Sequence, residues 1–289
     1  MDRFKPPTLR WPSDESAPSV SDSLRKRIIT AAILIALLLV VLLALPSLAT
    51  VILLTVAVLI GAWEWSGFLK GPGLAMRVGY VLLVALLLPL AWRLAASRTG
   101  LEWLLRAALL WWLAALGWIV LAPHRVRTWS AALAGLCALV PAWIALVSMR
   151  LDSGRGAQWV LFVLILVWFA DIGAYFVGRQ FGRCHLAPEV SPGKTWEGAL
   201  GGLVASVPVA VIGGFWFRVP LGAFLGVCLA AVAFSIVGDL TESLLKRFAG
   251  IKDSGTLFPG HGGIMDRIDS LTGAAPVLLL GLTFLGVLP

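Results

Sequence analysis

The sequence predicts an all-α polytopic integral membrane protein with about nine transmembrane helices. Hydrophobic residues make up 60% of the 289 residues and charged residues only 13%, and the mean hydropathy is +0.94. A soluble domain carries about 25% charged residues. Apolar runs of about 20 residues, the length that crosses the hydrocarbon core of a bilayer, recur along the chain. The alternating strands of a transmembrane barrel do not occur in the sequence.

Polar or proline-containing breaks divide the apolar runs into nine predicted helices. Pro46 with Ser47 separates the first two runs, and Pro220 separates the seventh from the eighth, because proline cannot continue a helix. The predicted ranges are about 28–46, 49–68, 76–95, 103–122, 130–149, 158–178, 198–217, 221–240 and 268–288.

The distribution of charge predicts how the helices are oriented. Residues 1–23 are polar and rich in Pro, Ser and Asp, which is typical of a disordered tail. The basic residues 25–27 before the first helix place the N-terminus in the cytoplasm, so nine spans leave the C-terminus outside. Most of the 23 Lys and Arg residues then face the cytoplasm, as the positive-inside rule requires. The polar loops 179–197 and 241–267 are therefore predicted to be cytoplasmic.

The two halves of the chain differ in their polar content. Residues 24–157 (about five helices) are mostly Leu, Ala, Val and Trp, which predicts a transmembrane scaffold, whereas about half of the 15 acidic residues lie between Asp171 and Asp269. Residues 158–289 (about four helices) are therefore the predicted catalytic region. The net charge of +8 is better explained by loops that face anionic membrane lipids than by nucleic-acid binding.

The sixth helix carries a carboxylate at membrane depth. Asp171, Tyr175 and Arg179 recur every four residues and so share one face. A charge inside the bilayer usually has a function. The alternative is that Asp171 and Arg179, or a neighbouring helix, only neutralise each other.

The eighth helix carries a polar stripe that leaves the membrane. It consists of Asp239, Glu242, Ser243, Lys246 and Arg247. A solvated helix face would explain the two cations, but it explains Asp239 poorly because the surrounding residues are apolar.

The segment PGHGGIMDRIDS precedes and opens the ninth helix. Asp266 and Asp269 lie three residues apart, so both project from one side, and either could simply balance the helix dipole. The glycines before them allow the backbone to approach a phosphate closely. His261, between those glycines, is a candidate for substrate contact, with loop shaping as the alternative.

These carboxylates suit Mg²⁺, which is typically held by one or two carboxylates and by substrate phosphates. Asp239 and Asp266 are the first candidate ligands, Asp269 is the next, and Asp171 is a fourth. A second metal ion is an alternative that the sequence leaves open.

The loop after the sixth helix contains SPGKT. A P-loop is excluded, because Pro188 stands where that motif needs glycine. Ser191, Lys194 and Thr195 remain candidate phosphate contacts at the start of the seventh helix.

Together these segments resemble the signature of the phosphatidate cytidylyltransferases, the CDP-diacylglycerol synthases. The matching residues are Ser243, Lys246-Arg247, Lys252-Asp253, Ser254-Gly255, Pro259 to Gly263, Asp266-Arg267 and Asp269. DIGAYFVGRQFGR, SPGKTWEG and GDLTES resemble further regions of that family. The resemblance covers roughly residues 168–270, and the N-terminal half adds only its hydropathy and a Trp-Glu-Trp in the second helix.

The resemblance implies Mg²⁺-dependent transfer of the cytidylyl group of CTP to phosphatidate, giving CDP-diacylglycerol and pyrophosphate, with the site at the cytoplasmic surface of a bacterial plasma (inner) membrane. The implied catalytic residues are Lys246, Arg247, Lys252, Asp253, His261 and Arg267. The implied substrate-binding residues are Asp171, Tyr175, Arg179, Ser191, Lys194, Thr195, Ser243, Gly262 and Gly263. The implied metal ligands are Asp239, Asp266 and Asp269.

Two other functions compete with this one. A CTP-dependent polyprenol or phytol kinase would also join a nucleotide to a lipid acceptor, but it is not expected to keep the whole string of motifs. A transporter could use Asp171 and Asp239 along an ion path, but it would not need a phosphate-type loop. The pattern of the CDP-alcohol phosphotransferases is absent from the sequence. A homodimer, the acyl-chain preference and the choice between CTP and dCTP stay open.

Overall fold

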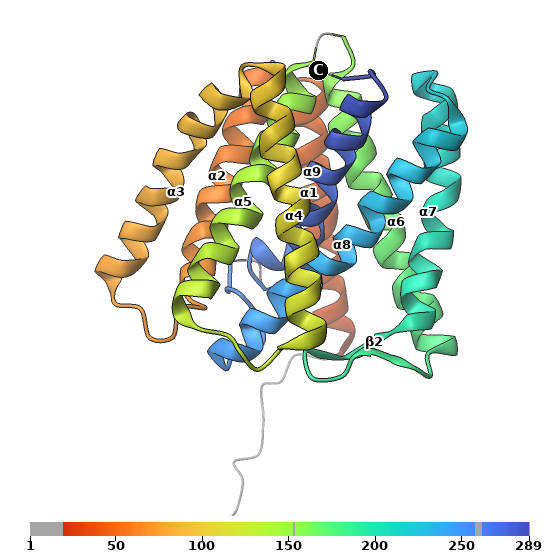
Figure 1. Cartoon of the computed structure of the whole chain (residues 1–289). Helices are drawn as coiled ribbons and strands as arrows, with labels where there is room; N and C mark the ends of the chain where they lie inside the picture. The colour runs from red at the N-terminus through yellow and green to blue at the C-terminus, as the bar shows by residue number, and fades with distance from the viewer. Residues whose placement is uncertain (1–19, 153, 258–261, 289) are drawn as a thin grey trace, which may run out of the picture.

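The computed structural model describes residues 20–152, 154–257 and 262–288, with the side chains of residues 20–28 and 31 left out. This part of the chain forms nine helices and one pair of short strands (Figure 1). The helices are α1 (Val20–Leu43), α2 (Ser47–Ser66), α3 (Leu74–Ala95), α4 (Arg98–Leu121), α5 (Thr128–Leu151), α6 (Gly156–Phe181), α7 (Trp196–Phe217), α8 (Leu221–Ala249) and α9 (Met265–Phe284). The strands are β1 (His185–Ala187) and β2 (Ser191–Thr195).

The nine predicted helices are all present, and the predicted breaks between them are confirmed. Pro46 directly precedes α2 and Pro220 directly precedes α8. Helix α1 begins at Val20, within the predicted tail 1–23, and residues 1–19 lie outside the described residues. Seven helices, α2 to α8, are long and apolar enough to cross a membrane, which is consistent with an all-α membrane protein.

Helix α8 is longer than predicted. We expected it to end near residue 240, but it continues to Ala249, because its charged residues prolong the helix instead of ending it. Gly250 ends it with a φ of 74°, a left-handed conformation that glycine adopts without strain. The amides of Gly250 and Ile251 then bond to the carbonyls of Arg247 and Lys246. At about 1.5 Å per residue, the 29 residues of α8 exceed the thickness of a hydrocarbon core.

Helix α9 runs through the middle of the bundle (Figure 1) and packs against α8, α5, α4 and α6. Most of its residues are buried, including Met265 at its start, which is 0% exposed. The first turn of α9, which carries Asp266, therefore has one side packed against other helices.

Helices α6 and α7 pack closely because small residues face each other. A Cβ atom added at Gly202 of α7 would lie only 2.7 Å from the backbone oxygen of Ala170 in α6, so this crossing favours glycine. The pair forms one wall of the site described below.

The connection between α6 and α7 contains a feature that the sequence analysis missed. Strands β1 and β2 pair in an antiparallel sense, with His185 opposite Thr195 and Ala187 opposite Ser191. SPGKT is itself strand β2, and α7 follows it directly. This order differs from the strand–loop–helix of a P-loop, which agrees with the exclusion of that motif.

The β1–β2 hairpin lies at one end of the bundle, and the C-terminus lies at the other (Figure 1). His124 Nε2 lies 3.0 Å from Glu189 Oε2, and this contact joins the α4–α5 connection to the hairpin. The polar residues described next lie in the half of the molecule that contains the hairpin.

Candidate active site

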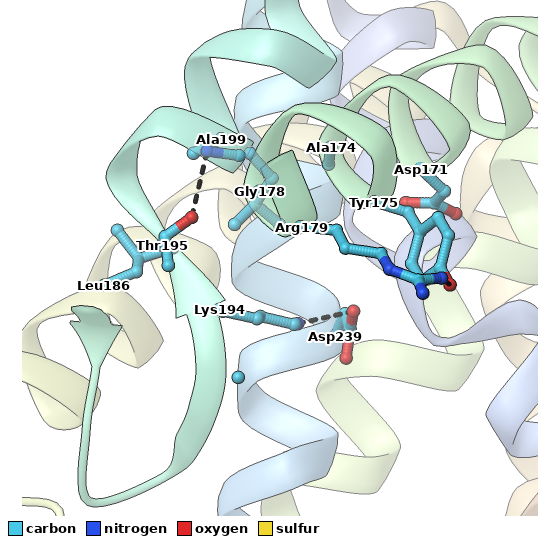
Figure 2. Close-up of a pocket in the computed structure, with 13 residues that line it drawn as sticks. Asp171, Ala174, Tyr175, Gly178, Arg179, Leu186, Lys194, Thr195, Ala199 and Asp239 are labelled. Atoms are coloured by element: carbon cyan, nitrogen blue, oxygen red, sulfur yellow. Dashed lines mark hydrogen bonds and ion pairs between the residues drawn. The ribbon is translucent and has the colours of Figure 1, made fainter. Parts of the chain in front are cut away.

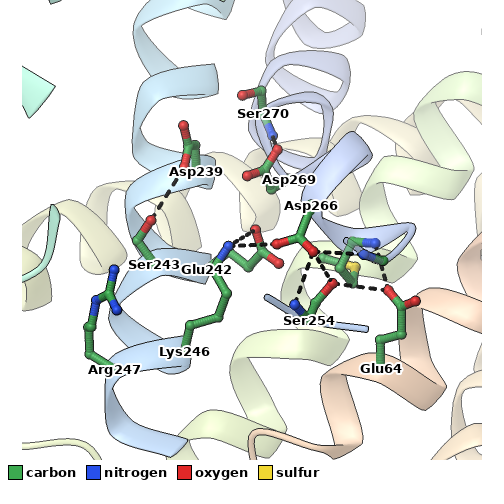
Figure 3. Close-up of polar contacts among 12 residues, drawn as sticks. Glu64, Asp239, Glu242, Ser243, Lys246, Arg247, Ser254, Asp266, Asp269 and Ser270 are labelled. Carbon is green, nitrogen blue, oxygen red and sulfur yellow. Dashed lines mark hydrogen bonds and ion pairs between the residues drawn. The ribbon is translucent and has the colours of Figure 1, made fainter. Parts of the chain in front are cut away.

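Glu242 and Lys246 of the polar stripe on α8 face Asp266 at the start of α9 (Figure 3). Glu242 is 1% exposed, and its carboxylate lies 3.2 Å from the ammonium of Lys246, one turn further along α8. Ser243 Oγ lies 3.4 Å from Asp239 Oδ1. Lys246 also lies 2.8 Å from Asp266 Oδ1 on α9. The side chain of Lys246 is only 12% exposed, so it is a buried bridge between two helices rather than part of a solvated face.

Asp266 receives further hydrogen bonds from the loop that precedes it. The amide of Gly263 donates to Oδ2 at 2.8 Å, and both the amide and the hydroxyl of Ser254 donate to the same oxygen, at 3.0 and 2.8 Å. With Lys246, Asp266 therefore has four donors. Gly262 adopts a φ of 74°, which lets the loop turn tightly in front of this carboxylate.

Several carboxylates follow one another along α6, α8 and α9. Asp269 is close enough to interact electrostatically with both Asp239 and Glu242. Asp171 interacts in the same way with Asp239 and with Lys194. Because like charges close together repel each other, this row of carboxylates needs nearby cations. Lys194 supplies one beside Asp239, and Lys246 supplies another beside Asp266.

A cavity of about 520 Å³ lies beside this row, between α6, α7, α8 and the hairpin (Figure 2). Lys194 of β2 reaches across it to form an ion pair with Asp239. Arg179 donates a 2.9 Å hydrogen bond to the hydroxyl of Tyr175. Asp171, Tyr175 and Arg179 all line the cavity, so the predicted face of the sixth helix is a cavity wall. The volume is in the range of small-molecule sites.

The two halves of the predicted SPGKT site differ in role. Thr195 lines the cavity and also caps α7, because its hydroxyl oxygen accepts the amide of Gly198 at 3.1 Å. Ser191 begins β2 and is half-buried. The hairpin thus holds Lys194 between these two residues, directed at α8.

The remaining predicted catalytic residues are exposed or lie outside the described residues. Arg247 is exposed and donates to the carbonyl of Val190 at 3.4 Å. Lys252, Asp253 and Arg267 are also exposed. His261, like Pro259 and Gly260, lies outside the described residues, so its predicted role stays a prediction.

Three residues absent from the predicted site belong to it by position. Glu242 stood on the predicted stripe but received no role, although its i, i+4 spacing to Lys246 was a usable signal. Ser254 was noted only as a small residue. Glu64 of α2 is 7% exposed and contacts the loop before α9, and its signal was a single carboxylate between two tryptophans in an apolar helix.

The donor set suits a hard cation, because the row offers carboxylate oxygens. Among the residues that the structure describes, no three His, Cys, Asp or Glu side chains form a metal-binding group. Asp239 and Asp266 are each paired with a lysine instead. Since Mg²⁺ often uses one or two carboxylates with water and substrate phosphates, these residues fit an ion that binds together with a nucleotide.

Comparison with known proteins places this site in a family context. The model of the cytidylyltransferase family matches residues 25–285. The phosphatidate cytidylyltransferase of Pseudomonas aeruginosa is 42% identical over 267 residues, which cover 88% of this chain and 95% of that protein. The enzyme of the same name from Haemophilus influenzae is 39% identical over 277 residues, covering 88% of this chain and 96% of that protein. That from Brucella suis is 44% identical over 160 residues, 53% of this chain and 57% of its own length. The similarity extends through the N-terminal half, further than the motifs alone indicated.

Proposed function

The chain belongs to the cytidylyltransferase family, and we propose that it transfers the cytidylyl group of CTP to phosphatidate in phospholipid synthesis. The products are CDP-diacylglycerol and pyrophosphate. The observation that carries this proposal is the joining of Asp266, Lys246 and Glu242 at the point where α8 meets α9. Such a set of alternating charges can hold phosphate groups and a cation together.

The reaction forms one bond and breaks another at the α-phosphorus of CTP. A phosphate oxygen of phosphatidate attacks that phosphorus, and pyrophosphate leaves with the electrons of the broken P–O bond. The attacking oxygen is already anionic, so no residue has to remove a proton from it. The enzyme's task is therefore positioning and charge neutralisation.

The cations of the site would neutralise the phosphates. Lys194 lines the cavity, whereas Lys246 lies outside the cavity lining, beside Asp266. Each lysine is held by a carboxylate, which fixes the position of its ammonium group before substrate binds. Further proposed contacts are Arg247 on α8, Arg267 on α9, and Lys252, Asp253 and His261 between these two helices.

Asp239, Asp266 and Asp269 would hold Mg²⁺ together with the nucleotide. When bound, this ion would offset phosphate charge and orient the α-phosphorus. A lysine that now pairs with a ligand carboxylate could then turn to a phosphate oxygen. Ser191, Thr195, Ser243, Gly262 and Gly263 remain proposed substrate contacts.

The proposed location is the cytoplasmic surface of a bacterial plasma membrane. CTP is water-soluble and phosphatidate is a lipid, so the site has to be open to both. In this proposal α1 and α9 also cross the membrane, the N-terminus is cytoplasmic and the C-terminus is outside. The placement of the hairpin and the C-terminus at opposite ends of the bundle supports this orientation (Figure 1).

The test is an assay of the purified protein with radiolabelled CTP, phosphatidate and Mg²⁺. We expect labelled CDP-diacylglycerol, and we expect Asp239→Asn and Asp266→Asn to abolish its formation while the proteins stay folded. Asparagine keeps the size of aspartate but loses the charge. A folded wild-type sample that labels no lipid would refute the function, and a variant with near-normal activity would refute that residue's role.

A further inference from the structure

Glu64 is a buried carboxylate from the N-terminal half of the chain, and the chemistry proposed above does not use it. Its carboxylate accepts hydrogen bonds from the amides of Ile264 and Met265, at 3.1 and 2.8 Å, and from Ser254 Oγ at 3.2 Å (Figure 3). A buried charge is costly unless hydrogen bonds compensate it. Here the two amides do so, together with the Ser254 hydroxyl, whose one hydrogen is shared with Asp266. All three groups belong to the loop and helix start that carry Asp266.

The two amides are donors that α9 cannot satisfy itself. The first amides of a helix lack partners within the helix and usually bond to a capping side chain just before it. The N-cap position of α9 is Ile264, whose side chain has no oxygen. Glu64 supplies the missing acceptor from another helix, and its negative charge is favourable at a helix N-terminus.

The loop backbone approaches Glu64 so closely that it requires glycine. A Cβ atom at Gly263 or at Gly255 would overlap the Glu64 carboxylate. The two described parts of the loop before α9, residues 251–257 and 262–264, therefore both contact this one side chain.

Helix α2 holds Glu64 in a fixed position. The neighbouring indole of Trp65 is buried and donates to the carbonyl of Ala131 in α5 at 2.8 Å. A side chain added at Gly61, one turn earlier, would lie 3.0 Å from Met265 Sδ, so α2 also packs directly against the start of α9.

Ser254 links Glu64 to Asp266, because its single hydroxyl hydrogen lies within reach of both carboxylates. We infer that Glu64 is a positioning residue: it holds Ser254 and the first turn of α9, so that Asp266 can turn an oxygen toward a cation without releasing the loop. This inference rests on the proposed function, in which Asp266 is a metal ligand. It makes the N-terminal half part of the active site and not only a scaffold.

The test compares Glu64→Gln with Glu102→Gln, a matched change in the same half of the chain, in a surface pair with Arg98 and Arg106. The glutamine amide group would face backbone N–H donors, so at least one of them loses its acceptor. We expect kcat of Glu64→Gln to fall about 10- to 100-fold, as for other residues that orient metal ligands. The Mg²⁺ concentration for half-maximal rate should rise, while Glu102→Gln stays within about twofold of wild type in both quantities.

A second readout needs neither metal nor turnover. In the metal-free protein, amide hydrogen exchange in peptides that cover residues 262–267 should be faster in Glu64→Gln than in wild type, and unchanged in Glu102→Gln. If Glu64→Gln does not fold, Gly255→Ala serves instead, because it pushes the loop from an intact Glu64. Its control is Gly226→Ala, since Gly226 has open space around it. Gly255→Ala should lower kcat, and Gly226→Ala should not.

The outcomes separate this inference from the proposed function. An active wild-type protein, an inactive Asp266→Asn and a Glu64→Gln with normal kcat and exchange would overturn the role of Glu64 and leave the function standing. No lipid product from the wild type would overturn the function itself. Slower turnover of Glu64→Gln with unchanged exchange at residues 262–267 would also overturn the positioning role.

Discussion

Replacing Lys246 by methionine should destabilise the protein strongly. The ammonium lies 3.2 Å from Glu242 and 2.8 Å from Asp266 in a setting where Glu242 is 1% exposed. Each hydrogen bond to a charged group contributes about 1.5–3 kcal/mol. Asp266 keeps its donors from Gly263 and Ser254, so the loss falls mainly on Glu242. We expect a loss of about 3–5 kcal/mol, the usual cost of a buried charge that loses its partner.

The reasoning also predicts a rescue. Adding Glu242→Gln to Lys246→Met removes the unpaired charge, so the double variant should recover most of the lost stability. The control is Arg98→Met, which breaks an exposed pair with Glu102 and should cost less than about 1 kcal/mol. The free energy of unfolding can be measured by SDS titration of the detergent-purified proteins. A loss below about 1 kcal/mol for Lys246→Met, or a double variant no more stable than the single one, would refute the argument.

Three further predictions concern activity. Lys194→Met should lower kcat/KM about 10- to 150-fold. The variant loses a charged hydrogen bond of about 1.5–3 kcal/mol, and each 1.36 kcal/mol corresponds to a factor of ten in rate. An unchanged kcat/KM in initial-rate assays would exclude Lys194 from phosphate binding. Chelation with EDTA should abolish lipid labelling and added Mg²⁺ should restore it, whereas labelling that persists without divalent cations would contradict a metal-assisted reaction. Lys70→Ala should leave the rate within about twofold, since Lys70 is an exposed loop residue over the ring of Phe248, and a large loss would mean that the site lies elsewhere.

The helices were predictable because each depends on a local property of the sequence. Apolar runs of membrane length form helices, and Pro46 and Pro220 lie at the breaks between them. Proline alone does not predict a break, since the structure also has a proline inside each of α3, α5, α7 and α9. The predicted range of the eighth helix stopped near residue 240, where its apolar run ends, although the polar stripe through Arg247 had been placed on the same helix. The β1–β2 hairpin was missed because SPGKT contains proline and glycine, which are rare in strands.

The contacts within the site were less predictable than its residues. The stripe of α8 was visible in the sequence, but nothing in α8 indicates that the start of α9 covers Lys246. That contact converts an apparently solvated cation into a buried bridge. Glu64 was missed for the same reason, since its partners lie on a loop that the sequence places far away.

The hydrogen bonds of Glu64 bear on the order of folding. They join residues 200 and 201 positions apart in the chain. Contacts of such separation carry a high loop-closure entropy and tend to form late. Individual helices can form early from local interactions, but the α9 cap depends on α2 and α5 having already docked. During refolding, the return of enzymatic activity should therefore lag behind the return of helical structure.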